Sequence, residues 1–274
     1  MNTITLNNGV TMPQLGFGSW QVPDDEAERA VSVALKAGYR SIDTAKLYRN
    51  EEGVGRAVRE SGIPRNELFV TTKLWNRDHG HDNALRAFDA SVERLGLDVV
   101  DLYLIHWPCP AQGRYVETWK ALEKLYADGR VRAIGVSNFT AETLDRLLAE
   151  AEVVPAVNQI ELHPQFGQAE MRAVNAKHGI VTEAWSPLGQ GQGLLDLPLL
   201  AEIGGRYGRS PAQVVLRWHI QLGHVVIPKS VTPARIRENI EVFDFALDQE
   251  EMDAITALDS GRRLGPDPAR FNRA

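Results

Sequence analysis

Four residues that together could transfer a proton lie at or just after short apolar runs. Asp43 ends one run, Tyr48 follows five residues later, and Lys73 and His106 end the next two. A free tyrosine is a weak acid at neutral pH, with a pKa of about 10. A nearby ammonium would lower that pKa, by about two units in our expectation, and a carboxylate would hold the ammonium in place. We therefore predict a proton donor built from Tyr48, Lys73 and Asp43, with His106 orienting a carbonyl oxygen toward it.

Each of these residues also has an ordinary structural explanation. Asp43 and Lys73 could be an ion pair that only stabilises the protein, and Tyr48 could be an aromatic residue at a rim. His106, which is followed by Trp107, could be a core histidine with both ring nitrogens hydrogen-bonded. Their shared placement after successive strands favours the chemical interpretation.

The elements that would position these side chains alternate β-branched runs with amphipathic stretches. The predicted strands are Leu15–Gly18, Tyr39–Asp43, Phe69–Lys73, Val99–His106, Val131–Val136, Ala156–Leu162, Ile180–Trp185 and Val225–Pro228. Apolar residues at helical spacing predict helices that include Asp24–Ala37, Asn83–Leu95, Tyr115–Ala127 and Thr140–Ala149. Eight alternations in about 250 residues are typical of a (β/α)₈ TIM barrel, whose functional side chains follow the strands. We therefore predict an α/β fold of that kind.

Local signals mark several boundaries. Asp24, Thr140 and Ser210 are predicted helix N-caps, and Ser210 is followed by a proline that suits the first helical turn. Residues 4–12 are predicted to form a β-hairpin, turned at Asn8-Gly9, that closes the N-terminal end of the barrel.

Composition narrows the range of functions. The chain has 274 residues, 30 Lys+Arg against 36 Asp+Glu, a net charge of -6 and one cysteine, Cys109. That charge argues against nucleic-acid binding, and a lone cysteine fits a reducing compartment. The N-terminus lacks the pattern of a secretory signal, and no apolar run is long enough to span a bilayer. We expect a cytoplasmic monomer with one domain over residues 1–274 and no membrane or nucleic-acid partner.

Six ordered sequence blocks resemble the signatures of the aldo-keto reductases. They are the segments 43–51, 71–75, 101–108, 134–139, 158–164 and 227–230, the last followed by Arg235, Glu238 and Asn239. Within the family the chain is most similar to the prokaryotic branch that contains 2,5-diketo-D-gluconate reductases, through the runs 154–159 and 187–191.

The resemblance implies NADPH-dependent reduction of an aldehyde or ketone to an alcohol, without a metal. Tyr48 would be the general acid, Lys73 and Asp43 would tune it, and His106 would orient the carbonyl. Diketo sugar acids and small dicarbonyls are the substrates that this branch suggests.

The resemblance also implies a cofactor site. Trp185 would stack on the nicotinamide, and Ser137, Asn138 and Gln159 would bind its carboxamide. A glycine-rich loop would approach the pyrophosphate, and two cations with a hydroxyl, Lys229, Arg235 and Ser230, would neutralise a 2′-phosphate and favour NADPH over NADH. The remaining predicted cofactor residues are Ser186, Leu188, Gly189, Gln190, Val231, Thr232, Glu238 and Asn239.

The resemblance also implies that three tryptophans, Trp20, Trp75 and Trp107, line the substrate pocket. They could equally be core packing, but their positions just beyond the ends of strands favour the pocket. The arginine-rich C-terminal segment 261–273 could be a frayed terminus. In the related enzymes this segment borders the substrate site, so the resemblance implies a preference for anionic or polyhydroxy carbonyl compounds. The pair His79 and His81 resembles a metal-hydrolase motif, but no further ligands fall at suitable spacing, so we predict no metal. Two alternatives stay open: a metal-dependent barrel hydrolase, and a non-catalytic NADP(H)-binding regulatory subunit.

Overall fold

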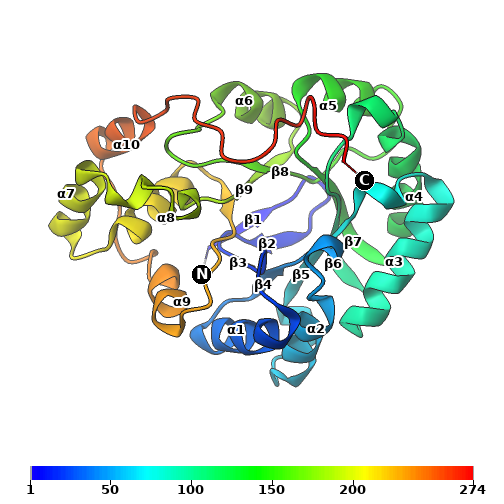
Figure 1. Cartoon of the computed structure of the whole chain (residues 1–274), viewed down its shortest axis with the longest axis horizontal. Helices are drawn as coiled ribbons and strands as arrows, with labels where there is room; N and C mark the ends of the chain where they lie inside the picture. The colour runs from blue at the N-terminus through cyan, green and yellow to red at the C-terminus, as the bar shows by residue number, and fades with distance from the viewer. Residues whose placement is uncertain (1, 274) are drawn as a thin grey trace.

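Eight parallel strands form one sheet whose order follows the sequence. In the computed structural model, which describes residues 2–273, they are β3 (Phe17–Gly18), β4 (Ser41–Asp43), β5 (Phe69–Leu74), β6 (Val100–Ile105), β7 (Val131–Ser137), β8 (Val157–Glu161), β9 (Val181–Trp185) and β10 (Val225–Val226). The predicted strands are all present, although the first and last are shorter than expected. The fold is the predicted α/β barrel (Figure 1).

Backbone hydrogen bonds between the first and last strand regions close the barrel. The Gly16 amide donates to the Val226 carbonyl at 2.8 Å, and the Val226 amide donates to the Gln14 carbonyl at 3.0 Å. A Cβ atom at Gly18 would lie 2.8 Å from the Ile227 carbonyl oxygen, so this close approach requires glycine. The glycines at 16 and 18 therefore serve barrel closure.

Helices cover the outside of the barrel (Figure 1). They are α1 (Asp24–Ala37), α2 (Glu51–Glu60), α3 (His81–Leu95), α4 (Tyr115–Ala127), α5 (Ala141–Leu148), α6 (Ala169–Lys177), α7 (Pro198–Tyr207), α8 (Pro211–Gln221), α9 (Pro233–Ile240) and α10 (Gln249–Thr256). Short 3₁₀ helices occupy several loops, among them η1 (Lys46–Tyr48) and η3 (Asn76–Asp78).

The predicted caps are correct at two of three positions. Thr140 and Ser210 each accept from the backbone three residues on, in capping boxes. The prediction for Asp24 is wrong, because Pro23 is the N-cap and Asp24 belongs to the first turn. Its carboxylate instead accepts from the Gly53 amide at 2.7 Å and pairs with Arg56, which joins α1 to α2.

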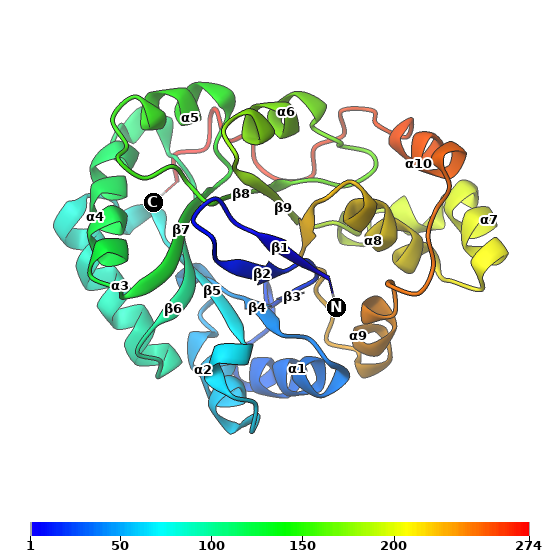
Figure 2. The same cartoon turned by 180° about the vertical axis from the view of Figure 1, so that it is seen from behind.

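The N-terminal hairpin closes one end of the barrel, as predicted. Strand β1 (Thr3–Thr5) pairs antiparallel with β2 (Thr11–Pro13), and the hairpin crosses the barrel mouth seen in Figure 2. Leu6 and Met12 are buried among barrel residues such as Leu102 and Leu104. Within residues 2–273, no helix has both the length and the apolar composition that crossing a membrane requires.

Candidate active site

One large cavity opens at the carboxyl ends of the strands. Its volume is about 1250 Å³, and Asp43, Tyr48 and His106 lie on its wall. The predicted cofactor and substrate residues on the same wall are Trp20, Trp75, Trp107, Ser137, Asn138, Gln159, Trp185, Ser186, Leu188, Gln190, Lys229, Ser230, Arg235, Glu238 and Asn239. The structure thus brings together side chains that lie more than 200 positions apart in the sequence.

Three predicted cofactor residues are not on this wall. Val231 packs against the core, and Thr232 is the N-cap residue of α9. Gly189 faces Leu194, because a Cβ atom there would lie 2.8 Å from the Leu194 Cβ. These positions therefore shape the loops around the cavity.

Lys73 lies directly behind the wall, in a buried ion pair. Its Nζ atom is 2.6 Å from Asp43 Oδ1, and it donates a second hydrogen bond to the Thr44 carbonyl at 2.9 Å. Burial alone would lower the pKa of Lys73, but the charge of Asp43 and the neighbouring Tyr48 raise it above its ordinary value. The lysine is therefore a cation at neutral pH.

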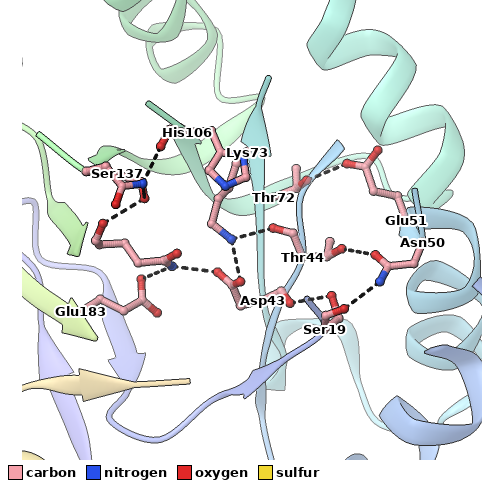
Figure 3. A network of polar contacts seen from close by, with 12 residues as sticks. Ser19, Asp43, Thr44, Asn50, Glu51, Thr72, Lys73, His106, Ser137 and Glu183 are labelled. Atoms are coloured by element: carbon pink, nitrogen blue, oxygen red, sulfur yellow. Dashed lines mark hydrogen bonds and ion pairs between the residues drawn. The ribbon is translucent and has the colours of Figure 1, made fainter. Parts of the chain in front are cut away.

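Tyr48 is positioned by a loop that buried polar residues hold on both sides (Figure 3). Asn50 accepts from the Thr44 hydroxyl at 2.7 Å and donates to the carbonyls of Ser19 and Val22. On the other side, Thr72 of β5 donates to Glu51 at 2.6 Å. The loop from β4 to α2 is thereby fixed to its neighbours, and the Lys73 ammonium lies 5.1 Å from the centre of the Tyr48 ring.

The acidity of Tyr48 differs from the prediction. Burial raises the pKa of Tyr48 to about 12, and the positive charge of Lys73 offsets only part of this rise. Asp43 and a second carboxyl group, Glu183, push the pKa of Tyr48 further upward. The predicted net decrease in the pKa of Tyr48 is therefore wrong for the protein alone. The prediction included the charge of the Lys73 ammonium but left out the loss of water around the phenol.

His106 is a neutral ring beside Tyr48. The two ring centres are 5.7 Å apart in an edge-to-face arrangement, and Trp75 contacts the histidine from another side. Burial, together with the charge of Lys73, lowers the pKa of His106 well below its ordinary value. Its Nδ1 atom has no hydrogen-bond partner among residues 2–273, which disagrees with a fully hydrogen-bonded core histidine.

The predicted carboxamide residues form a hydrogen-bonded group at the ends of β7, β8 and β9. Asn138 donates to the His106 carbonyl and to the Ser137 hydroxyl, and its Oδ1 accepts from the Trp185 indole at 2.8 Å. Gln159 donates to Asp43 at 2.9 Å. The indole and the amides are therefore held in place before any ligand enters.

Backbone strain concentrates on the same face. The non-glycine residues with positive φ in the described chain are Gln21, Arg49, Cys109, Asn138, Gln168, Ser186 and Gln190. Each of them lies in a loop that follows a strand at its carboxyl end. Left-handed conformations are unfavourable for such residues and persist where the surrounding structure fixes them, commonly at functional sites.

The two cations and the hydroxyl that are predicted to bind a 2′-phosphate line the cavity. Lys229, Ser230 and Arg235 line it just before and within α9. Neither Lys229 nor Arg235 forms an ion pair with any residue in 2–273. Their charges are available to an anionic ligand.

The C-terminal segment covers the opposite part of the cavity. Phe271 contacts the Trp107 ring, with centres 4.5 Å apart, and Asn76 donates to the Arg273 carbonyl at 2.7 Å. Near the start of the segment, the Leu264 and Gly265 amides donate to the carboxylate of Glu161 at 2.6 and 2.9 Å, respectively. This cover could not be predicted from periodicity, since the segment contains no regular helix or strand.

Gly265 approaches the indole that the prediction assigns to the nicotinamide. A Cβ atom there would lie 2.5 Å from the Trp185 ring, so the close contact requires glycine. Cys109 lies beneath Trp75 and Trp107, and burial raises the pKa of its thiol to about 12, so it stays protonated.

Several functional candidates were not predicted from the sequence. Leu47, Arg49 and Arg77 line the mouth of the cavity, which also includes Arg273 of the C-terminal segment that was predicted to influence substrate preference. Glu183 of β9 is fully buried next to the Asp43 network. A loop arginine or a single glutamate inside a strand has no distinctive spacing, so no pattern in the sequence identifies these residues.

No cluster of metal ligands is present in the described part of the chain. Within residues 2–273, no three His, Cys, Asp or Glu side chains converge as a metal site would require. Burial lowers the pKa of His79 to about 4, and the exposed His81 pairs with Asp82. The histidine pair is therefore divided between the interior and the surface.

A closed (β/α)₈ barrel with an Asp–Lys–Tyr–His group at the carboxyl ends of its strands is the arrangement of a carbonyl-reducing barrel enzyme. The chain belongs to the Aldo/keto reductase family, which it matches over residues 12–260. This agrees with the resemblance seen in the sequence blocks.

Similar proteins cover nearly the whole chain. An aldo-keto reductase of Mycolicibacterium smegmatis is 58% identical over 269 residues, with 98% of each chain covered. Methylglyoxal reductase DkgA of Yersinia pestis is 55% identical, covering 98% of this chain and 96% of its own. A solved structure of a Gox0644 variant in complex with NADPH superimposes with a TM-score of 0.94 at 51% identity, with 98% of each chain covered.

Proposed function

We propose that this protein reduces small aldehydes and ketones to alcohols with NADPH, with Tyr48 as the general acid. The observation that carries the proposal is the joint geometry of Tyr48, Lys73 and Asp43 on the wall of one cavity. The relatives support it, since one is described as a methylglyoxal reductase and another binds NADPH.

His106 and Tyr48 would have separate roles in the reduction of the carbonyl group. The reduced nicotinamide supplies a hydride to the carbonyl carbon when it is bound. His106, neutral at physiological pH, would hold the carbonyl oxygen next to the Tyr48 hydroxyl. Tyr48 would then donate its proton to the alkoxide. An alkoxide is about as basic as hydroxide, whose conjugate acid, water, has a pKa of about 16. Transfer from a phenol with a pKa of about 12 is therefore favourable.

The phenolate left behind would be stabilised by Lys73. The ammonium is already fixed by Asp43 and the Thr44 carbonyl, so little reorganisation accompanies the charge that develops on the phenol. An ammonium has three donors, and these two contacts leave one free. This division of contacts supports the role of Asp43 as a positioning residue for the lysine.

The residues present fit a dinucleotide with a 2′-phosphate. Trp185 offers an aromatic face, and Lys229 and Arg235 offer two cations without partners among the described residues. Gln159 contributes an amide oxygen that accepts no hydrogen bond from residues 2–273. These residues would hold the nicotinamide at one end and the phosphate at the other.

For the substrate, we propose small dicarbonyl compounds or diketo sugar acids. The residues that line the cavity include two exposed apolar side chains, Trp20 and Leu47, and three arginines at positions 49, 77 and 273. Such a lining would accept a short polar chain that carries a carboxylate or several hydroxyl groups. We also propose that a cytoplasmic monomer, one domain over residues 1–274, is the working form.

The direct test is NADPH consumption by the purified protein. We expect saturable loss of NADPH absorbance with methylglyoxal, and we would compare diketo sugar acids, methylglyoxal and aromatic aldehydes at saturating NADPH. Cofactor binding without turnover of any of these would favour the non-catalytic regulatory subunit instead. Hydrolysis that depends on a bound metal would favour the barrel hydrolase.

A further inference from the structure

The amide of Gln159 is held by two carboxyl groups. Its Nε2 atom donates to Asp43 Oδ2 and to Glu183 Oε2, both at 2.9 Å. A primary amide nitrogen carries two hydrogens, so both donors are used. The amide oxygen, Oε1, has no hydrogen-bond partner among residues 2–273, and the side chain lines the cavity.

Glu183 approaches this amide from the neighbouring strand. It is the register partner of Gln159 in the β8–β9 pair, and its side chain is fully buried. Its Oε1 atom has no partner in the described part of the chain. Figure 3 shows the carboxyl group on the far side of the network from the loop that carries Asn50.

We propose that Glu183 is a positioning residue that fixes the Gln159 amide, so that Oε1 of Gln159 faces the carboxamide of the nicotinamide. The inference rests on the proposed function, since it assigns a role within that cofactor site. A flipped amide would set Oε1 against the ionised Asp43 carboxylate and lose that hydrogen bond. Asp43 alone would supply a single acceptor, whereas two acceptors from different strands, β4 and β9, fix both the position and the orientation of the amide.

The protonation of Glu183 agrees with this role. Burial and the charge of Asp43 raise the pKa of Glu183 to about 8, so the group is mostly neutral at pH 7. The ionisable groups that face it are Asp43 of β4, Lys73 of β5 and Tyr48 of η1. A neutral acid accepts the amide hydrogen through its carbonyl oxygen without adding a second negative charge beside Asp43.

The test compares two variants of similar size, of which one keeps an acceptor for the Gln159 amide and the other removes it. Glu183→Gln keeps an acceptor oxygen, while Glu183→Met keeps the length of the side chain and removes the acceptor. The dissociation constants of NADPH and NADP⁺ are measured by quenching of tryptophan fluorescence. We expect E183M to weaken NADPH binding by roughly tenfold, the equivalent of one hydrogen bond, and E183Q to stay within about twofold of the parent.

A double-mutant cycle separates positioning from a general structural effect. If Glu183 acts through Gln159, then adding E183M to Gln159→Met changes the NADPH dissociation constant by less than about twofold. The proposal is overturned if E183M binds NADPH like the parent, if E183Q is as weak as E183M, or if the E183M effect persists in the Q159M background. Should E183M fail to fold, Glu183→Ala is measured under the same criteria.

The same experiments distinguish this inference from the proposed function. Turnover with methylglyoxal tests the reductase, whereas the cofactor dissociation constants test Glu183. An active enzyme in which E183M and E183Q bind NADPH equally well refutes the positioning role alone. A parent protein that binds no NADPH refutes both.

Discussion

Lys73 and Asp43 form a 2.6 Å ion pair in which the lysine side chain is 0% exposed and the aspartate 3%. Taking two charges out of water is costly, and such a pair is often no more stabilising than apolar residues of similar size. In the proposed mechanism the pair has a second role, because it holds the ammonium next to Tyr48, where a phenolate would form. The proposed mechanism therefore explains the pair by chemistry and does not require it to stabilise the fold.

This relationship predicts separate effects on activity and stability. Lys73→Met leaves the buried Asp43 carboxylate without a positively charged partner, so we expect a loss of roughly 3–5 kcal/mol of unfolding free energy together with loss of turnover. Adding Asp43→Asn to K73M removes the unpaired charge. Denaturant unfolding of the double variant is expected to show recovered stability, while NADPH consumption stays abolished. Recovered turnover in the double variant would contradict the role of Lys73.

Removal of the Tyr48 hydroxyl tests the general acid. Tyr48→Phe should lower kcat by about 10²–10⁴-fold, because general acid catalysis contributes about that much. The NADPH dissociation constant should change little, since the ring remains. Tyr103→Phe is the matched control, because the Tyr103 hydroxyl is buried and has no partner among residues 2–273. Normal turnover by Y48F would refute the proposed mechanism.

The two unpaired cations near α9 should set the cofactor preference. In Lys229→Gly with Arg235→Ala, KM for NADPH should rise far more than KM for NADH, because only NADPH carries the 2′-phosphate. Arg237→Ala is a suitable control, since Arg237 is an exposed arginine of α9 that does not line the cavity. Equal increases for the two cofactors would remove the phosphate-site assignment.

The arginine at the end of the C-terminal segment should affect charged substrates. Arg273 lines the cavity, whereas Arg270, three residues earlier, does not. We expect Arg273→Ala to lower kcat/KM for a diketo sugar acid more than for methylglyoxal, and Arg270→Ala to leave the ratio unchanged. Steady-state kinetics with both substrates measure this ratio. A proportional loss for both substrates in R273A would indicate a general packing effect.

Two buried histidines predict that stability depends on pH. The Nδ1 atoms of His219 and His224 are 3.3 Å apart, and His224 also lies 3.5 Å from Arg172. Burial and the charge of Arg172 lower the pKa of His224 to about 3, and burial lowers that of His219 as well. Both rings are therefore neutral in the folded protein at neutral pH.

Because these folded-state pKa values lie below the unfolded value of about 6.5, only the unfolded chain binds the protons in between. The unfolding free energy is thus fully retained above pH 6.5 and falls as the pH drops toward 3. Each such histidine contributes a slope of about 1.4 kcal/mol per pH unit. The unfolding free energy of His224→Gln, measured with denaturant between pH 6.5 and 4, should depend less steeply on pH, by the contribution of about one proton. An unchanged pH dependence would contradict this account.

The sequence predicted the elements and the wall of the cavity well, for a physical reason. Parallel strands place their carboxyl ends on one face, so a residue such as Asp43, Lys73 or Gln159 is located once its strand is recognised. Recognising the strands was therefore enough to place these residues on the wall of the cavity. The capping motifs at Thr140 and Ser210 are likewise local and were predicted correctly.

Features that depend on contacts between distant segments were not predictable. Glu183 gains its importance from its pairing with Gln159, 24 positions earlier. The pKa of Tyr48 depends on how completely the surrounding protein displaces water, which no spacing pattern reports. The path of the C-terminal segment follows from its contacts with Glu161 and Asn76, since it has no periodicity of its own.

Several hydrogen bonds that hold the C-terminal segment on the barrel are made to its main chain. Glu161 accepts from two backbone amides, and Asn76 and Gln112 donate to the carbonyls of Arg273 and Asn272, respectively. Side chains of the segment that make no such contact can therefore be exchanged during evolution without releasing it, whereas Gly265, Phe271 and Asn272 are constrained by contacts with the barrel. Descendants of this protein could acquire new substrate preferences by substitutions near the terminus while the catalytic floor of the barrel stays unchanged.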